Sequence, residues 1–136
     1  MTFSILVLLL TALAAVLTVG FYAWTGVPAL PTSPRVLGVM LALIDRAPRL
    51  RAVDLGSGYG TLVLETARRH PRTLVSGYEV SIVPFLISRV RLWAARLPNA
   101  SIRYGDFFQV DLSGYDLLTC YLTRAPMLRL RDKLDA

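Results

Sequence analysis

The residues of this sequence best suited to chemistry are glycines and carboxylates that follow short apolar runs. Gly56, Gly58 and Gly60 come directly after the run that ends at Leu55, and Asp54 stands just before them. Closely spaced glycines let the backbone turn sharply and approach a ligand without Cβ clashes. A carboxylate at Asp54 would repel a pyrophosphate but suits a cationic ligand that carries an amino group. The segment, with Ser57 in the turn, therefore predicts a ligand-binding loop.

Two further acids follow the next apolar runs. Glu79 ends the second run, where an acidic side chain can accept hydrogen bonds from both hydroxyls of a ribose. Asp106 follows the third run, where a carboxylate could accept from an adenine amino group. Each acid alone could be a turn cap, a solvated strand end or a loop residue. Their joint placement after successive strands favours one nucleoside site. Thr61 stands where a dinucleotide fingerprint needs its third glycine, which argues against a nicotinamide oxidoreductase.

The elements that must position these residues alternate along the chain. Apolar spacing and turn residues predict strands over 51–55, 73–79, 101–104 and 115–121, and helices over 36–44, 62–69, 82–97 and 126–134. Strands that alternate with helices form a parallel sheet with right-handed crossovers. The fold class predicted is α/β. In the helix over 82–97, capped by Ser81, one face is apolar and consists of Ile82, Leu86, Val90, Trp93 and Leu97.

The N-terminal segment, residues 1–25, is a predicted transmembrane anchor. Residues 3–24 carry no charge, and about 20 apolar residues span the hydrocarbon core as a helix. Phe21, Tyr22 and Trp24 cluster at its end, as in an aromatic belt. A cleaved signal peptide would have a basic start and a shorter apolar run, and a buried core helix would need a larger protein around it. The stiff Pro-rich segment 26–35 is the expected linker, followed by the domain over 36–136.

Charge indicates the orientation of the anchor and excludes other classes of site. Basic residues occur only after the apolar segment, so the positive-inside rule places the C-terminal part in the cytoplasm. The net charge of +6 comes from scattered arginines rather than a run, which argues against nucleic acid as a partner and fits anionic headgroups nearby. Cys120 is a single cysteine and His70 a single histidine, so we expect no internal disulfide and no metal.

Taken together, these motifs resemble those of the class I methyltransferases that use S-adenosyl-L-methionine (AdoMet). Residues 53–60 resemble their first motif, Glu79 their ribose-binding acid, and Gly105-Asp106 their adenine-side acid. A narrower resemblance, over residues 28–134, is to the membrane-anchored protein lysine methyltransferases of mitochondria and their bacterial relatives, which modify the adenine nucleotide translocase and the ATP synthase c subunit. The shared features include the hydrophobic anchor, the Leu30-Pro31-Thr32 segment and residues 111–116.

The resemblance implies a Rossmann-like parallel sheet, AdoMet as cofactor, and methylation of a protein lysine at the bilayer, on the matrix side if the protein is mitochondrial. The implied cofactor-binding residues are Asp54, Gly56, Ser57, Gly58, Gly60, Glu79 and Asp106. This chain departs from the pattern at Tyr59, at Val80-Ser81 and at residues 123–126. It has about four of the family's seven strands, so the alternative is a truncated, non-catalytic AdoMet-binding module. No general base is identified. Asp116, Tyr121 and Thr123 lie near the expected acceptor side, but strand packing is the favoured explanation for each.

Overall fold

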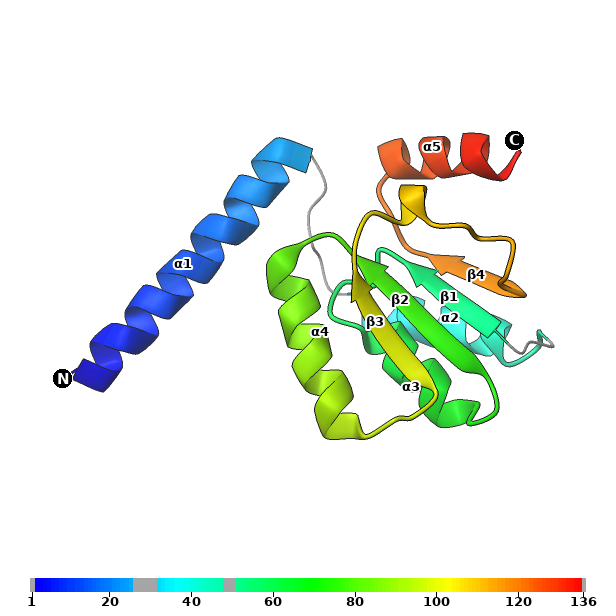
Figure 1. Cartoon of the computed structure of the whole chain (residues 1–136), viewed down its shortest axis with the longest axis horizontal. Helices are drawn as coiled ribbons and strands as arrows, with labels where there is room; N and C mark the ends of the chain where they lie inside the picture. Colours follow the sequence, from blue (N-terminus) through cyan, green and yellow to red (C-terminus); the bar gives the residue numbers. More distant parts are fainter. Residues whose placement is uncertain (1, 26–31, 48–50, 136) are drawn as a thin grey trace.

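A computed structural model describes residues 2–25, 32–47 and 51–135 and contains an α/β domain preceded by one long helix (Figure 1). The helices are α1 (Thr2–Thr25), α2 (Pro34–Ile44), α3 (Thr61–Arg69), α4 (Ile82–Ala95) and α5 (Arg124–Leu134), with a 3₁₀ turn, η1 (Phe107–Gln109). The strands are β1 (Arg51–Leu55), β2 (Leu74–Glu79), β3 (Ala100–Tyr104) and β4 (Leu117–Cys120). The predicted alternation of strands and helices is confirmed.

The four strands form one parallel sheet in the order β3-β2-β1-β4. Ala52, Val53 and Leu55 of β1 are all buried, and because successive side chains point to opposite faces, both faces of this central strand are covered. One core cluster joins Val53 and Leu55 to Leu112 and to Leu130 of α5. The sheet order places the ends of β1 and β2, and with them Asp54 and Glu79, side by side at the carboxyl edge.

The opposite face of the sheet is covered by α3 and α4. Val63, Ala67, Val75 and Ile102 form its core cluster, with Phe85 and Leu92 of α4 packed against it. The helix α2 packs on α3 through a third cluster of Leu41, Ile44 and Leu62. This cluster, with Met40 packed against it, holds α2 close to the loop that follows β1 and to the pocket at that loop.

Four residues of the predicted apolar face, Ile82, Leu86, Val90 and Trp93, point away from the sheet, whereas the fifth, Leu97, packs against the core. The amphipathic pattern does not predict this, because such a face normally covers the core. Trp93 is 82% exposed, whereas Pro84 and Ser88 on the opposite side of the helix are fully buried. The cause is a close approach of the glycine loop. A Cβ on Gly60 would lie 3.1 Å from Cβ of Ser88, so only a small side chain fits there.

Gly60 is expected to be essential for this packing. Its φ is +74°, and an added Cβ would lie 2.7 Å from Cδ1 of Ile102 in the core. Gly60→Ala should therefore lower the free energy of unfolding of the full chain by about 2–3 kcal/mol, from backbone strain and overpacking together. Gly38→Ala is the matched control, since nothing lies within 4 Å of its Cβ position inside α2. It should stabilise by about 0.5–1 kcal/mol. Denaturant titration in detergent measures the free energy of unfolding of both variants. Equal changes in the two variants would contradict the prediction.

The N-terminal helix α1 is long and apolar enough to cross a membrane. Its window Phe3–Gly20 has a mean hydropathy of 2.5, and none of that window is buried within the structure. The described residues therefore do not bury this helix in a core. A signal sequence has the same position and composition, so the retained anchor belongs to the proposals below. The aromatic side chains at 21–24 lie outside the residues whose side chains are described.

Candidate cofactor site

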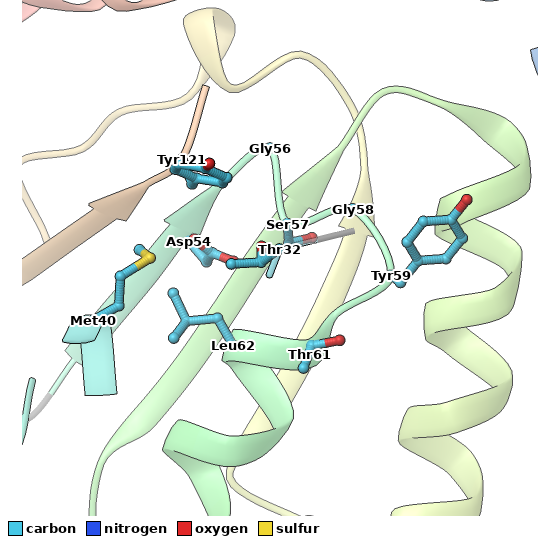
Figure 2. A pocket seen from close by; sticks show the side chains of 10 residues that line it. All are labelled: Thr32, Met40, Asp54, Gly56, Ser57, Gly58, Tyr59, Thr61, Leu62 and Tyr121. Atoms are coloured by element: carbon cyan, nitrogen blue, oxygen red, sulfur yellow. The ribbon is translucent and has the colours of Figure 1, made fainter. Parts of the chain in front are cut away.

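A pocket opens at the carboxyl edge of the sheet, between the loop after β1, the start of α3 and the segment that leads into α2 (Figure 2). Its empty volume is about 440 Å³, which includes space open to solvent. The lining residues are Thr32, Met40, Asp54, Gly56, Ser57, Gly58, Tyr59, Thr61, Leu62 and Tyr121.

The loop that forms the floor of the pocket depends on its glycines. Gly56, Gly58 and Gly60 all have positive φ, between 53° and 74°, a conformation that other residues adopt at a cost of about 1–2 kcal/mol each. The backbone N–H groups of Gly56 and Ser57 both donate to the carbonyl of Tyr78 on β2. A Cβ on Gly58 would meet nothing within 4 Å, so the backbone there faces open space. The sequence thus forms a bare backbone surface that a ligand can approach.

Asp54 is buried beneath this loop, with 6% of its surface exposed. Its Oδ1 accepts a hydrogen bond of 3.0 Å from the hydroxyl of Thr119 on the neighbouring strand β4. Burial raises the pKa of the Asp54 carboxyl from 3.8 to about 7; the Thr119 hydrogen bond opposes this rise, and the charge of Glu79 adds to it. A carboxyl held near neutrality in this way gains most from a cation placed beside it.

The carboxylate of Glu79 holds the glycine loop through hydrogen bonds to backbone N–H groups. Its Oε2 accepts from the backbone N–H of Gly58 at 2.6 Å, and its Oε1 accepts from the N–H of Ser81 at 2.7 Å. The side chain is buried, with 6% exposed, and does not itself line the pocket. An ionised carboxylate has about four acceptor positions, so two remain for ligand hydroxyls. Glu79 therefore fixes the glycine loop, a role that its place in the sequence does not reveal.

The hydroxyl of Ser57 adds an unused hydrogen-bonding group. Within the described part of the chain its Oγ is buried and has no hydrogen-bond partner. Buried polar groups in native proteins are nearly always paired, and an unpaired one calls for an explanation. The Oγ atom lies against β2, where a Cβ on Gly77 would be 2.8 Å from it.

Of the other residues predicted from the sequence, some lie at the pocket and some do not. Asp106 lies after β3 on an exposed turn, where its Oδ1 accepts from the N–H of Phe108, and it is not among the pocket residues. Gly60 caps α3 next to the pocket. Tyr121, expected near the acceptor side, lines the pocket, whereas Thr123 caps α5.

Asp116 has the strand-packing role that the sequence favours rather than a place on the acceptor side. Its Oδ2 accepts from the N–H of Arg51 at the start of β1, which is the opposite edge of the sheet. Asp116 precedes β4, whereas ligands bind beyond the carboxyl ends of the strands.

Sequence reasoning also missed part of the lining. Thr32, Met40 and Leu62 face Asp54 across the pocket (Figure 2), but only the packing of α2 on α3 brings Thr32 and Met40 there. The one available signal was the Pro-Thr segment that precedes α2. Tyr59 points away from these side chains, toward α4, where its carbonyl accepts from Arg91.

The comparison with protein families identifies the domain. A family model for the ANTKMT methyltransferase domain matches residues 54–136. The chain belongs to the ANTKMT methyltransferase family. No match was found among functionally curated proteins. The domain of this ANTKMT-family chain is an AdoMet-dependent methyltransferase domain with the Rossmann-like parallel sheet predicted from its sequence.

Solved structures agree with this assignment. The chain is similar to an RNA methyltransferase from Salinibacter ruber in complex with S-adenosyl-L-homocysteine, with 30% identity, a TM-score of 0.67, and coverage of 77% of this chain and 69% of that one. Two others share the fold: a SAM-dependent methyltransferase from Geobacter sulfurreducens (24%, TM-score 0.55, 66% and 36% covered) and a precorrin-6y C5,15-methyltransferase from Geobacter metallireducens GS-15 (19%, TM-score 0.64, 78% and 57% covered). The chain thus spans from about a third to about two thirds of these relatives.

The residues present fit AdoMet. Bare backbone at Gly58 and the buried carboxyl of Asp54 line one pocket. AdoMet is a nucleoside that carries a sulfonium and an amino group. Its positive charge complements the carboxyl of Asp54, and its hydrogen-bond donors and flat base complement the polar and apolar side chains of the pocket.

Proposed function

We propose that this ANTKMT-family chain is a membrane-anchored, AdoMet-dependent methyltransferase that modifies lysine in a protein substrate at the bilayer. The observation that carries the proposal is the position of Thr32. This residue lines the pocket together with Asp54, and it follows the last residue of α1, Thr25, by a short segment. Seven residue steps reach at most about 25 Å, so α1, if it is retained in the membrane, holds the pocket that close to the bilayer.

In the proposed site, Asp54 would pair with the amino group of AdoMet, and Glu79 would accept from the ribose hydroxyls while it holds the loop. Ser57 and the backbone at Gly56 and Gly58 would contact the methionine part, and Asp106 would accept from the adenine amino group. AdoMet supplies the methyl group as an electrophilic sulfonium. The task of the chain is to align the two reacting atoms, which accounts for much of the catalysis in transfers of this kind.

The acceptor side of the proposed site is the mouth of the pocket. Tyr121, at the end of β4, is 57% exposed there and can contact an incoming lysine side chain. A lysine must lose its proton before it attacks, because only the neutral amine is nucleophilic. We propose a single-pass orientation with the domain in the cytoplasm, from the positive-inside distribution of arginine, and no metal in the reaction.

RNA is a second candidate acceptor, because the most similar of the structures described above is an RNA methyltransferase. Against it, the positive charge of this chain is scattered over the sequence rather than concentrated in a run.

One labelling experiment tests these alternatives. Membranes of the host organism are incubated with the full chain and tritiated AdoMet, and the products are separated on a denaturing gel and treated with ribonuclease or protease. We expect a labelled membrane protein whose label survives ribonuclease and appears in methyl-lysine after hydrolysis. Label lost with ribonuclease would favour the RNA acceptor. Binding of AdoMet without any labelled product would favour the non-catalytic module.

A further inference from the structure

The outward face of α4 is an unusual surface for a domain in water. Four large apolar side chains on one side of this helix are exposed: Ile82 by 46%, Leu86 by 55%, Val90 by 65% and Trp93 by 82%. We call these four residues the α4 stripe. Their spacing of four, four and three residues places them in one row along the helix. Contiguous exposed apolar surface of this kind marks an interaction site.

The charge around the stripe is of one sign. Residues 80–105, which form α4 and the edge strand β3, contain four arginines and no acidic residue. Arg89 and Arg96 of the α4 segment are exposed, whereas Arg103 of β3 lies on the other face of the sheet, beside Tyr78. A helix with Trp and aliphatic residues on one face and arginine at its borders is the pattern of helices that lie in the plane of a membrane interface. Long arginine side chains reach the headgroups while their stems cover apolar surface.

The place of the stripe in the fold is consistent with a lipid surface. The candidate membrane span α1 contacts α4 and lies beside it in Figure 1, yet it leaves Trp93 exposed. A surface that adjoins the span and remains uncovered by it is positioned to meet the bilayer that the span enters.

We propose that the α4 stripe docks onto the bilayer surface, with Trp93 at the level of the acyl chains nearest the headgroups and the arginines on anionic lipid. This rests on the proposed membrane anchoring by α1. Docking would fix the orientation of the domain, because Arg91 ties α4 to the glycine loop through bonds to the carbonyl of Tyr59 (2.6 Å) and the hydroxyl of Thr61 (2.9 Å). The pocket would then lie at a constant height above the membrane.

The test follows the environment of Trp93 in the full chain. In a Trp24→Phe background, Trp93 is the one remaining tryptophan. The protein is reconstituted into vesicles of phosphatidylcholine, with or without phosphatidylglycerol, and with bromine on the acyl chains near the headgroup. We expect the emission of Trp93 to shift to the blue relative to detergent and to be quenched by the brominated lipid, more strongly when phosphatidylglycerol is present. Each exposed arginine contributes about fivefold to the affinity for an anionic surface.

Two matched variants sharpen the result. Leu86→Glu places a charge in the stripe, whereas Leu74→Glu changes a leucine of similar exposure, 57%, at the start of β2. Leu86→Glu should lower the ratio of docked to undocked protein by about tenfold, while Leu74→Glu should leave the quenching unchanged.

Anchoring and docking are measured separately. Flotation of the vesicles after an alkaline wash reports whether α1 anchors the chain, and its failure would refute the anchor. Protein that floats but shows water-exposed, unquenched Trp93 would refute the docking alone. A blue shift without quenching by brominated lipid would mean that protein, either α1 or a second copy of the chain, covers the stripe, and would also overturn the proposal.

Discussion

Replacing Asp54 with asparagine is expected to weaken AdoMet binding at pH 7 by about tenfold to a hundredfold, the range of a hydrogen bond to a charged group. The same change should remove most of the pH dependence of binding. Because burial raises the pKa of Asp54 to about 7, the carboxyl is protonated in the ligand-free protein at lower pH. A cationic ligand binds the ionised form, so a proton must leave when it binds. The dissociation constant of the unmodified protein should therefore fall up to about tenfold per pH unit as pH rises toward 7.

Calorimetric titrations between pH 5.5 and 7 measure this dependence, since a free amino group remains protonated below a pKa of about 8. Asp111→Asn is the control. Hydrogen bonds from Ser113 hold the pKa of the Asp111 carboxyl below its ordinary value, so it does not titrate in this window. A pH dependence that persists unchanged in Asp54→Asn would remove Asp54 from the site.

The raised pKa of Asp54 also has a consequence for stability without ligand. The folded state binds this proton more tightly than the unfolded state, whose carboxyl titrates near 3.8. Between that pH and about 7 the folded state therefore carries more protons, and the contribution of Asp54 to the free energy of unfolding falls as pH rises. Asp54→Asn should flatten this slope in denaturant titrations, while Asp111→Asn should not.

Glu79→Gln is expected to weaken AdoMet binding by about a hundredfold. The carboxylate accepts from the N–H groups of Gly58 and Ser81, and an amide can satisfy only one of them while its own NH₂ faces the other. Each such bond to a charged acceptor is worth about 1.5–3 kcal/mol, so the loop loses its support even before ribose contacts are considered. The free energy of unfolding should fall by a similar amount.

The matched control for Glu79 is Glu65→Gln on the surface of α3. Glu65 pairs with Arg68 at 2.6 Å in an exposed pair, which is worth under about 1 kcal/mol. It should leave the affinity for AdoMet within about twofold. If both glutamine variants bound AdoMet equally well, the support of the loop by Glu79 would be refuted.

The strands and turns that depend on neighbouring residues in the sequence were predictable. The apolar run into three glycines specifies β1 and the turn, and Pro71 and Ser81 mark the boundaries around β2. The direction in which the apolar face of α4 points was not predictable, because it depends on the close approach of Gly60 to Ser88, which are far apart in the sequence. No pattern within the helix records that contact.

The site shows the same division. Asp54 and the glycines were found because their chemistry is local to one strand end. Thr32 and Met40 reach the pocket only through the docking of α2 on α3, and the double hydrogen bond of Glu79 to the loop depends on strand pairing between β1 and β2. Long-range packing of this kind leaves no spacing signal in the chain.

The measurement that tests the cofactor site most directly is a calorimetric titration of the folded full chain in detergent with S-adenosyl-L-homocysteine, the form of the cofactor that remains after methyl transfer. We predict heat from one saturable site, competition by AdoMet, and no heat with NAD. Folded protein that gives no heat with S-adenosyl-L-homocysteine or AdoMet would contradict the proposed site.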